Sequence, residues 1–150
     1  MKRTVVNLSL NVEERGAGEI SLLFLHYWGG THRTWNKVIS QLENSFHSVA
    51  YDMRGWGQSG AAESGYSLAE LANEAASLIQ QLGLKKYVLI GHSMGGKVAQ
   101  LLASRHPAGL VGLILVAPAA PTSTRFPEEA SAADSCLRQS RDGAPDHRVP

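Results

Sequence analysis

An α/β fold with a mostly parallel sheet, covered by helices on both faces, is the architecture that this sequence predicts. Short apolar runs of strand length alternate with segments whose apolar residues recur at helical spacing. Residues 21–27 (SLLFLHY) form a continuous apolar run, which is typical of a strand covered on both faces. In such a sheet, ligands bind beyond the carboxyl ends of the strands.

Each element follows from its own pattern. Residues 4–14 alternate apolar and polar side chains and close at Gly16-Ala17-Gly18, which predicts an antiparallel hairpin or edge pair. A short amphipathic helix is expected over residues 34–42, with Trp35, Val38, Ile39 and Leu42 on its apolar side. The other expected elements are strands over 48–51, 87–90 and 111–117 and a helix over 94–105 that ends at His106-Pro107.

The clearest helix lies between Ser67 and Gly83. Ser67 and Glu70 have the spacing of a capping box, which satisfies free N–H groups at a helix start. Gly83 supplies the left-handed residue that ends a helix. The apolar stripe between these ends consists of Leu68, Leu71, Ala72, Ala75, Leu78, Ile79 and Leu82.

Length and composition exclude several classes of protein. The chain has 150 residues, a net charge of +1 and no basic stripe, so it is not expected to bind nucleic acid. No apolar run approaches the roughly 20 residues of a membrane span, and no signal peptide is visible. We therefore expect a cytoplasmic protein without a membrane partner. With a single cysteine, Cys136, and no zinc-like Cys/His spacing, we expect neither an internal disulfide nor a zinc site. No metal or organic cofactor is implied by the sequence.

The character of the sequence changes after Pro121. Residues 122–150 contain only Phe126, Leu137 and Val149 as large apolar side chains. So few apolar residues cannot form a core, and the segment is expected to be a disordered tail. The expected organisation is a core over residues 1–121 and a tail over residues 122–150.

The segment Gly91-His92-Ser93-Met94-Gly95-Gly96 carries the strongest functional signal. It reads G-x-S-x-G between a predicted strand and a predicted helix, the context of a nucleophile elbow. Such a turn holds a serine in a strained conformation with its hydroxyl at the top of the sheet, and it needs very small residues on either side. The pattern predicts that Ser93 is a nucleophile.

A second loop, His26-Tyr27-Trp28-Gly29-Gly30, ends the strand over residues 21–27 and should face the same crevice as Ser93. Acyl transfer needs two backbone donors aimed at the developing oxyanion. The N–H of Met94, at a helix start, is one candidate, and an N–H of the 26–30 loop is the natural other.

Three motifs in this order resemble the α/β-hydrolase family, closest to its cofactor-free haloperoxidase, esterase and lactonase-like members. They are the two segments above and the turn over residues 52–59 (DMRGWGQS), and the resemblance covers roughly residues 4–121. It implies oxyanion donors at the backbone N–H groups of Met94 and Trp28. Tyr27 stands where many members have glycine, a variant that should leave the Trp28 amide usable. Trp28 and Tyr27 are candidate substrate-binding residues.

Other polar and aromatic residues have plainer interpretations. Asp52 and Arg54 are expected to be structural, with Asp52 binding turn amides. His26 is expected to brace the oxyanion loop, and His92 is too close to Ser93 to act easily as its base. Trp28 and Trp56 fit equally well as pocket lining or as cover for the end of the sheet. Surface or capping positions are expected for His32, His47 and His106.

The resemblance also implies a late acid and a late histidine, which the chain does not supply on any predicted strand. It is expected to be truncated or frame-shifted after about the sixth of roughly eight strands. His147 with Asp134, Asp142 or Asp146 satisfies the order, but in a segment with no predicted strand to hold them.

The resemblance implies a serine hydrolase that acts on an ester-like acyl bond of a small molecule through an acyl-enzyme. As written, the chain is expected to be inactive or nearly so. The alternatives are a perhydrolase, haloperoxidase or C–C bond hydrolase, or a non-catalytic pseudoenzyme or inert fragment. A bare sheet edge over residues 111–117 would favour self-association.

Overall fold

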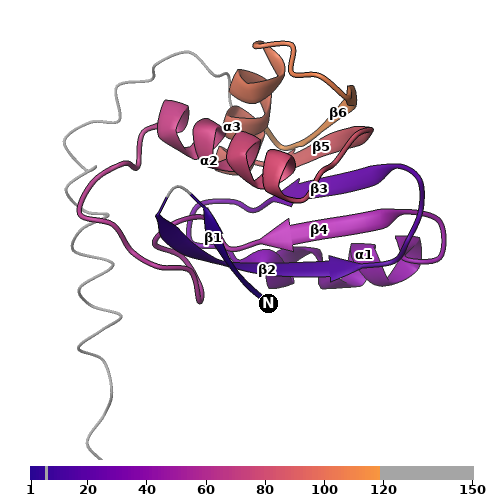
Figure 1. Ribbon diagram of the computed structural model, residues 1–150, viewed down its shortest axis with the longest axis horizontal. Helices are drawn as coiled ribbons and strands as arrows, with labels where there is room; N and C mark the ends of the chain where they lie inside the picture. Colours follow the sequence, from indigo (N-terminus) through magenta and orange to yellow (C-terminus); the bar gives the residue numbers. More distant parts are fainter. Residues whose placement is uncertain (6, 119–150) are drawn as a thin grey trace, which may run out of the picture.

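The computed structural model describes residues 1–5 and 7–118, which form a six-stranded sheet with helices on both faces (Figure 1). The strands lie in the order β1-β2-β4-β3-β5-β6. Their bounds are β1 Lys2–Val5, β2 Leu8–Arg15, β3 Ser21–Leu25, β4 His47–Tyr51, β5 Tyr87–His92 and β6 Leu110–Val116. The helices are the 3₁₀ helix η1 His32–Trp35, α1 Asn36–Leu42, α2 Leu68–Gln81 and α3 Met94–Ala103.

The predicted mixture of parallel and antiparallel strands is confirmed. β4, β3, β5 and β6 run parallel, whereas β1 pairs with β2 and β2 with β4 in antiparallel fashion. The amino-terminal hairpin turns near Asn7, which has a φ of +62°. Gly16 and Gly18 follow the end of β2 at Arg15, so they close the segment as expected, and they lie between β2 and β3. At Gly16 a Cβ atom would come within 2.2 Å of the Phe46 carbonyl oxygen, so the link packs against the chain ahead of β4.

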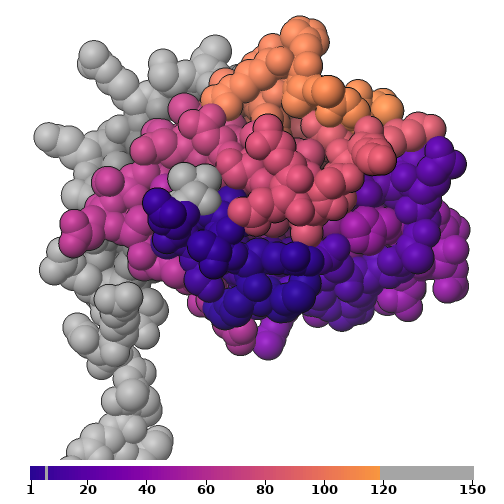
Figure 2. All heavy atoms as spheres, in the orientation of Figure 1, coloured from indigo at the N-terminus to yellow at the C-terminus, as the bar shows by residue number. Residues whose placement is uncertain are grey.

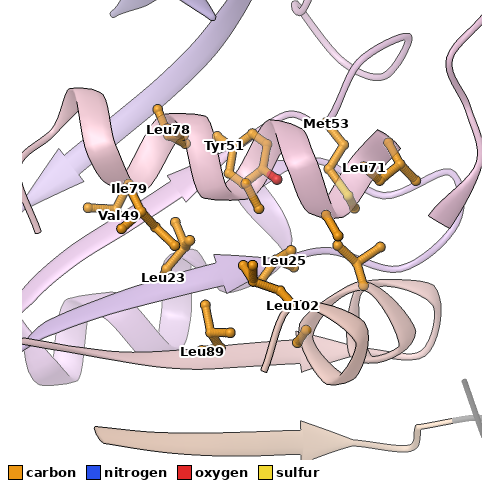
Figure 3. Packing of buried hydrophobic residues seen from close by; sticks show 14 of the residues in the cluster. Leu23, Leu25, Val49, Tyr51, Met53, Leu71, Leu78, Ile79, Leu89 and Leu102 are labelled. Carbon is orange, nitrogen blue, oxygen red and sulfur yellow. The ribbon is translucent and has the colours of Figure 1, made fainter. Parts of the chain in front are cut away.

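Two hydrophobic clusters occupy the two faces of the sheet, as expected for a strand buried on both sides. In β3, Leu23 and Leu25 belong to the larger cluster, and Leu22 and Phe24 to the smaller one. Helices α2 and α3 cover the larger cluster (Figure 3), and η1 and α1 cover the smaller one. Alternation along one strand thus sends side chains to both layers.

The helix expected over residues 34–42 is present in two parts. Residues His32–Trp35 form the 3₁₀ helix η1, and the α-helix begins only at Asn36. At 3.6 residues per turn, Val38 lies about 100° around the helix from Ile39, at the margin of the buried side. Trp35 and Ile39 are buried, but the assignment of Val38 to the buried side was wrong, since 44% of it is exposed.

Helix α2 begins as predicted with a complete capping box. The Ser67 hydroxyl accepts the N–H of Glu70 at 3.3 Å, and the Glu70 carboxylate accepts the N–H of Ser67 at 3.2 Å. Gly83, with a φ of +64°, lies in the left-handed region just beyond the helix. The buried side of α2 includes Leu71, Ala72, Ala75, Leu78 and Ile79 from the predicted stripe.

Strand β6 lies at one edge of the described sheet, and its residues lie at the upper margin of the molecule in Figure 2. Val111, Leu113, Ile114 and Val116 are each between 38% and 53% exposed. Both faces of this strand therefore present apolar side chains. Among the described residues, no helix is long and apolar enough to cross a membrane.

Replacement of Ser67 by alanine should lower the free energy of unfolding by about 1 kcal/mol, because an orphan N–H of the first turn loses its acceptor. Chemical denaturation gives this difference. Ser40→Ala is the control, since the Ser40 hydroxyl donates to the Lys37 carbonyl within α1 and caps no helix. Equal midpoints for Ser67→Ala and the parent chain would contradict the role of the cap.

We propose that the chain self-associates through β6, because an apolar edge strand without charged residues offers free N–H and C=O groups to other chains. Light scattering at tens of micromolar should show species larger than a monomer. Ile114→Lys, a charge at a half-exposed position, should reduce their share. A monodisperse monomer for the parent chain would mean that the edge is covered.

Candidate functional site

Ser93 occupies the turn between β5 and α3 in the strained conformation that the motif predicts. Its φ is +51° and its ψ is −110°, outside the usual regions for a residue with a side chain. β5 ends at His92 and α3 begins at Met94, so the turn contains Ser93 alone. Its hydroxyl makes no capping hydrogen bond to α3, although serine commonly caps a helix at this position. The predicted elbow geometry is confirmed.

Two glycines make this turn possible. At Gly91 a Cβ atom would lie 2.4 Å from the Gly95 carbonyl oxygen. At Gly95 it would lie 2.3 Å from the carbonyl oxygen of Leu25 and 2.5 Å from that of His26. No side chain fits at such distances, so the first turn of α3 rests directly on the backbone at the end of β3. The elbow and the 26–30 loop are therefore neighbours, as the sequence predicts.

The loop after β3 forms a tight turn. The Gly30 N–H donates to the Tyr27 carbonyl at 2.9 Å, and Gly29 has a φ of +78°, the pattern of a type II turn. This turn leaves the Trp28 N–H out of its own hydrogen bond. The Met94 N–H belongs to the first turn of α3, whose N–H groups have no partner within the helix. Both N–H groups predicted as oxyanion donors are thus free of the local backbone hydrogen bonds.

His26 braces this loop from the interior. It is fully buried, its Nε2 accepts the Met53 N–H at 3.1 Å, and its Nδ1 lies 2.7 Å from the Tyr27 carbonyl oxygen. Nδ1 must therefore carry the proton and donate to that carbonyl. Burial lowers the pKa of His26 below its ordinary value, which keeps the ring neutral. The structure thus supports the predicted bracing role, and both ring nitrogens are engaged.

Asp52 organises the glycine-rich turn after β4, as expected for a structural carboxylate. It accepts hydrogen bonds from the N–H and Nδ1 of His32, both at 2.7 Å, the Gln58 N–H at 2.9 Å and the Asn11 amide at 3.0 Å. Burial alone would raise the pKa of Asp52, but these donors outweigh it and lower the pKa. Four donors fill the acceptor capacity of a carboxylate.

The interpretation of His32 as a surface or capping residue was wrong. Its ring lies between two carboxylates, with Nδ1 at 2.7 Å from Asp52 and Nε2 at 3.2 Å from Glu13, and only 12% of its side chain is exposed. It joins β2, η1 and the turn after β4. His47 also has partners, the Ser21 hydroxyl and the Glu14 carboxylate. His106 is exposed, with a φ of +50° just after α3.

An ion pair that the sequence analysis missed fixes the other side of the same turn. Arg54 Nε donates to the Glu74 carboxylate of α2 at 2.8 Å, and the Arg54 N–H donates to it at 3.2 Å. Glu74 is fully buried, and burial raises its pKa although Arg54 opposes this. A signal was present, because Glu74 stands three residues after Leu71 and four before Leu78, on the apolar side of the helix.

Aromatic side chains surround the end of the sheet. Trp56 has edge-to-face contacts with Trp28, His26 and Tyr66, at ring-centroid distances of 5.2, 5.9 and 6.3 Å. Trp28 is 50% exposed and Tyr27 is 40% exposed. The Tyr27 ring lies against His92, the residue before Ser93, at 5.1 Å. Trp56 therefore covers the turn after β4, while Trp28 keeps half of its surface open.

The remaining predicted groups lie elsewhere. His147, Asp134, Asp142 and Asp146 fall outside the described residues, as does the tail over 122–150. Within residues 1–5 and 7–118, no hydrogen bond joins the Ser93 hydroxyl to an imidazole. The same part of the chain holds no group of three or more His, Cys, Asp or Glu side chains arranged so that it could bind a metal ion.

A family model described as alpha/beta hydrolase fold matches residues 20–145. The chain belongs to the α/β-hydrolase family. The match extends beyond residue 121, where the sequence analysis ended the resemblance. YisY, an AB hydrolase superfamily protein of Bacillus subtilis, is 34% identical to this chain over 127 residues. These residues make up 83% of this chain and 47% of YisY.

Solved structures show the same fold. An esterase from Exiguobacterium antarcticum matches with a TM-score of 0.79 and 28% identity, over 93% of this chain and 56% of that one. The epoxide hydrolase CorEH matches with a TM-score of 0.77 and 25% identity, over 91% of this chain and 49% of that one. This α/β hydrolase chain therefore spans about half the length of these relatives.

The buried, neutral His26 predicts that the free energy of unfolding depends on pH. Because the folded-state pKa of His26 is lowered from 6.5, the unfolded chain binds more protons below that pH, and stability is lost as the pH falls. His26→Gln should lower the free energy of unfolding by about 2 kcal/mol near pH 7.5. The difference from the parent should shrink toward pH 5, since glutamine does not titrate. Denaturation at both pH values measures it, and a difference that does not change with pH would contradict a neutral buried His26.

Proposed function

We propose that Ser93 is the nucleophile of a hydrolase that acts on an ester-like acyl bond through an acyl-enzyme. The observation that carries this proposal is the Ser93 turn, which is strained and makes no capping hydrogen bond. A serine with a purely structural role at a helix start would cap the helix. Backbone strain of this kind is kept where the surrounding structure needs it, which is often an active site.

The oxyanion donors in this proposal are the backbone N–H groups of Met94 and Trp28. A peptide group is planar, with its C=O and N–H pointing in opposite directions. The Tyr27 carbonyl accepts hydrogen bonds from Gly30 and His26. The N–H of the same peptide, that of Trp28, therefore points away from those donors and is free to bind a tetrahedral oxyanion.

The fold by itself does not choose the reaction, since the matching structures include both an esterase and an epoxide hydrolase. A serine at the elbow favours acyl transfer, because its deprotonated oxygen adds to the ester carbonyl carbon and the bond from that carbon to the leaving alcohol then breaks. The acyl group stays on Ser93 as an ester, the alcohol leaves with a proton, and water then hydrolyses the ester to release the acid. We expect no metal or organic cofactor in this step. The substrate is a small acyl compound, and Trp28, which is half-exposed, is placed to contact it.

The base is the open part of the mechanism. His26 is engaged at both ring nitrogens, and the His92 ring faces aromatic neighbours. His147, the late histidine, lies outside the described residues. Without a base that acts together with Ser93, only the oxyanion donors and substrate binding would accelerate the reaction. Their rate enhancement would be about 10³- to 10⁴-fold over the reaction in water.

Because the described residues supply no base for Ser93, a fluorophosphonate probe should label Ser93 of the full chain only slowly, as read by mass spectrometry, and turnover of a p-nitrophenyl ester should lie far below the ordinary enzyme range. Ser93→Ala should abolish both signals. Ser104→Ala is the matched control, since this exposed serine lies at the other end of α3 and its hydroxyl donates to the Leu101 carbonyl.

Two results would change the proposal. A Ser93 that is labelled no faster than the exposed Ser104 in the folded chain would contradict its role as nucleophile. Turnover in the ordinary enzyme range that is lost in both Ser93→Ala and His147→Ala would contradict the expected low activity and identify His147 as the base.

A further inference from the structure

The loop that carries Trp28 and the turn that carries Ser93 are joined by a contact between side chains. The Tyr27 ring meets the His92 imidazole edge to face, with ring centroids 5.1 Å apart and an angle of 66° between the planes. Attractive aromatic pairs lie at such distances and angles. Tyr27 directly precedes Trp28 and His92 directly precedes Ser93, so the contact links the two backbone segments that form the proposed site.

The His92 ring has a second aromatic neighbour. The second neighbour of His92 is Trp35, at 6.4 Å and 76°, which is only 6% exposed. Trp35 in turn packs against the buried ring of Phe24 at 5.1 Å. The His92 imidazole therefore contacts both Tyr27 and a ring of the hydrophobic core. If the Tyr27 ring moved, the ring of His92, the elbow residue that it contacts, would have to move as well.

The contact constrains the peptide group that joins Tyr27 to Trp28. The Tyr27 carbonyl is fixed from one side by the Gly30 N–H and the His26 ring. The side chain of the same residue, Tyr27, is held by its contact with the His92 ring. Two constraints on one residue determine the orientation of the following peptide plane, and with it the direction of the Trp28 N–H.

We propose that Tyr27 and His92 are positioning residues that hold the Trp28 N–H in register with the Met94 N–H. This inference rests on the proposed function of Ser93. Tyr27 is 40% exposed, so its ring is not placed by burial in the core. The contact with His92 gives it one position, and an oxyanion hole needs donors fixed to within fractions of an ångström.

The first test is the rate at which the fluorophosphonate labels Ser93. Tyr27→Ala should lower this rate about 10- to 100-fold, because a donor displaced by about 1 Å stabilises the oxyanion poorly. Tyr27→Phe keeps the ring and should restore most of the lost rate. Val38→Ala is the control, because Val38 is exposed to a similar degree on α1, and it should not change the rate.

A double-mutant cycle tests the contact itself. When His92→Ala is already present, Tyr27→Ala should cost little more, since the partner ring has gone. Additive losses would overturn the proposal, and so would an unchanged labelling rate in Tyr27→Ala. Melting temperatures of all variants show whether any loss comes from unfolding.

A second readout does not depend on Ser93 chemistry. In Tyr27→Ala, the NMR shifts of the His92 ring protons should change as the ring current is lost, and the Trp28 amide resonance should shift as its peptide plane reorients. If Ser93 of the parent chain is not labelled, the proposed function fails, but these signals still decide the positioning role. Unchanged His92 shifts and an unchanged Trp28 amide resonance would overturn it.

Discussion

The site depends on a contact between backbones that only glycine permits. At Gly95 a Cβ atom would approach the carbonyl oxygens of Leu25 and His26 to 2.3 and 2.5 Å. Because Leu25 ends β3 and His26 begins the following loop, this contact seats the first turn of α3 on the end of β3. A side chain at Gly95 would push the helix away and separate the N–H groups of Met94 and Trp28. The elbow is therefore a property of two adjacent strands, and not of the Ser93 turn alone.

A chain of hydrogen bonds carries this arrangement across the end of the sheet. The Met53 N–H donates to His26, and His26 donates to the Tyr27 carbonyl. Since that carbonyl shares a peptide plane with the Trp28 N–H, the turn after β4 orients a donor in the loop after β3. Asp52 and Arg54 fix the turn at its two sides. Residues that look catalytic in the sequence thus act as the frame on which the donors are held.

The elements that could be predicted from the sequence are those with a local signal. Gly91 and Gly95 bracket Ser93 at fixed spacing, and Ser67 with Glu70 mark a helix start, so the elbow and the cap were confirmed. Val38 was misplaced because it lies at the margin of the apolar stripe of α1, and the sequence pattern does not show how wide the buried side is. His32 and Asp52 are separated by 20 residues, and no periodicity indicates that they meet. The ring contact between Tyr27 and His92 is equally a product of the tertiary fold.

The polar residues that hold the loops differ from Ser93, the proposed nucleophile, in whether their hydrogen bonds are satisfied. This difference is clearer than any difference in residue type. Asp52 accepts four donors and has no further acceptor site for a catalytic histidine. His26 has both nitrogens engaged, and Glu74 is paired with Arg54. Ser93 differs from them, since it pays the strain of a positive φ and makes no capping bond with its hydroxyl. Buried polar groups that are satisfied rigidify a structure. This contrast, drawn among the described residues, supports our proposal that the Ser93 hydroxyl is the nucleophile.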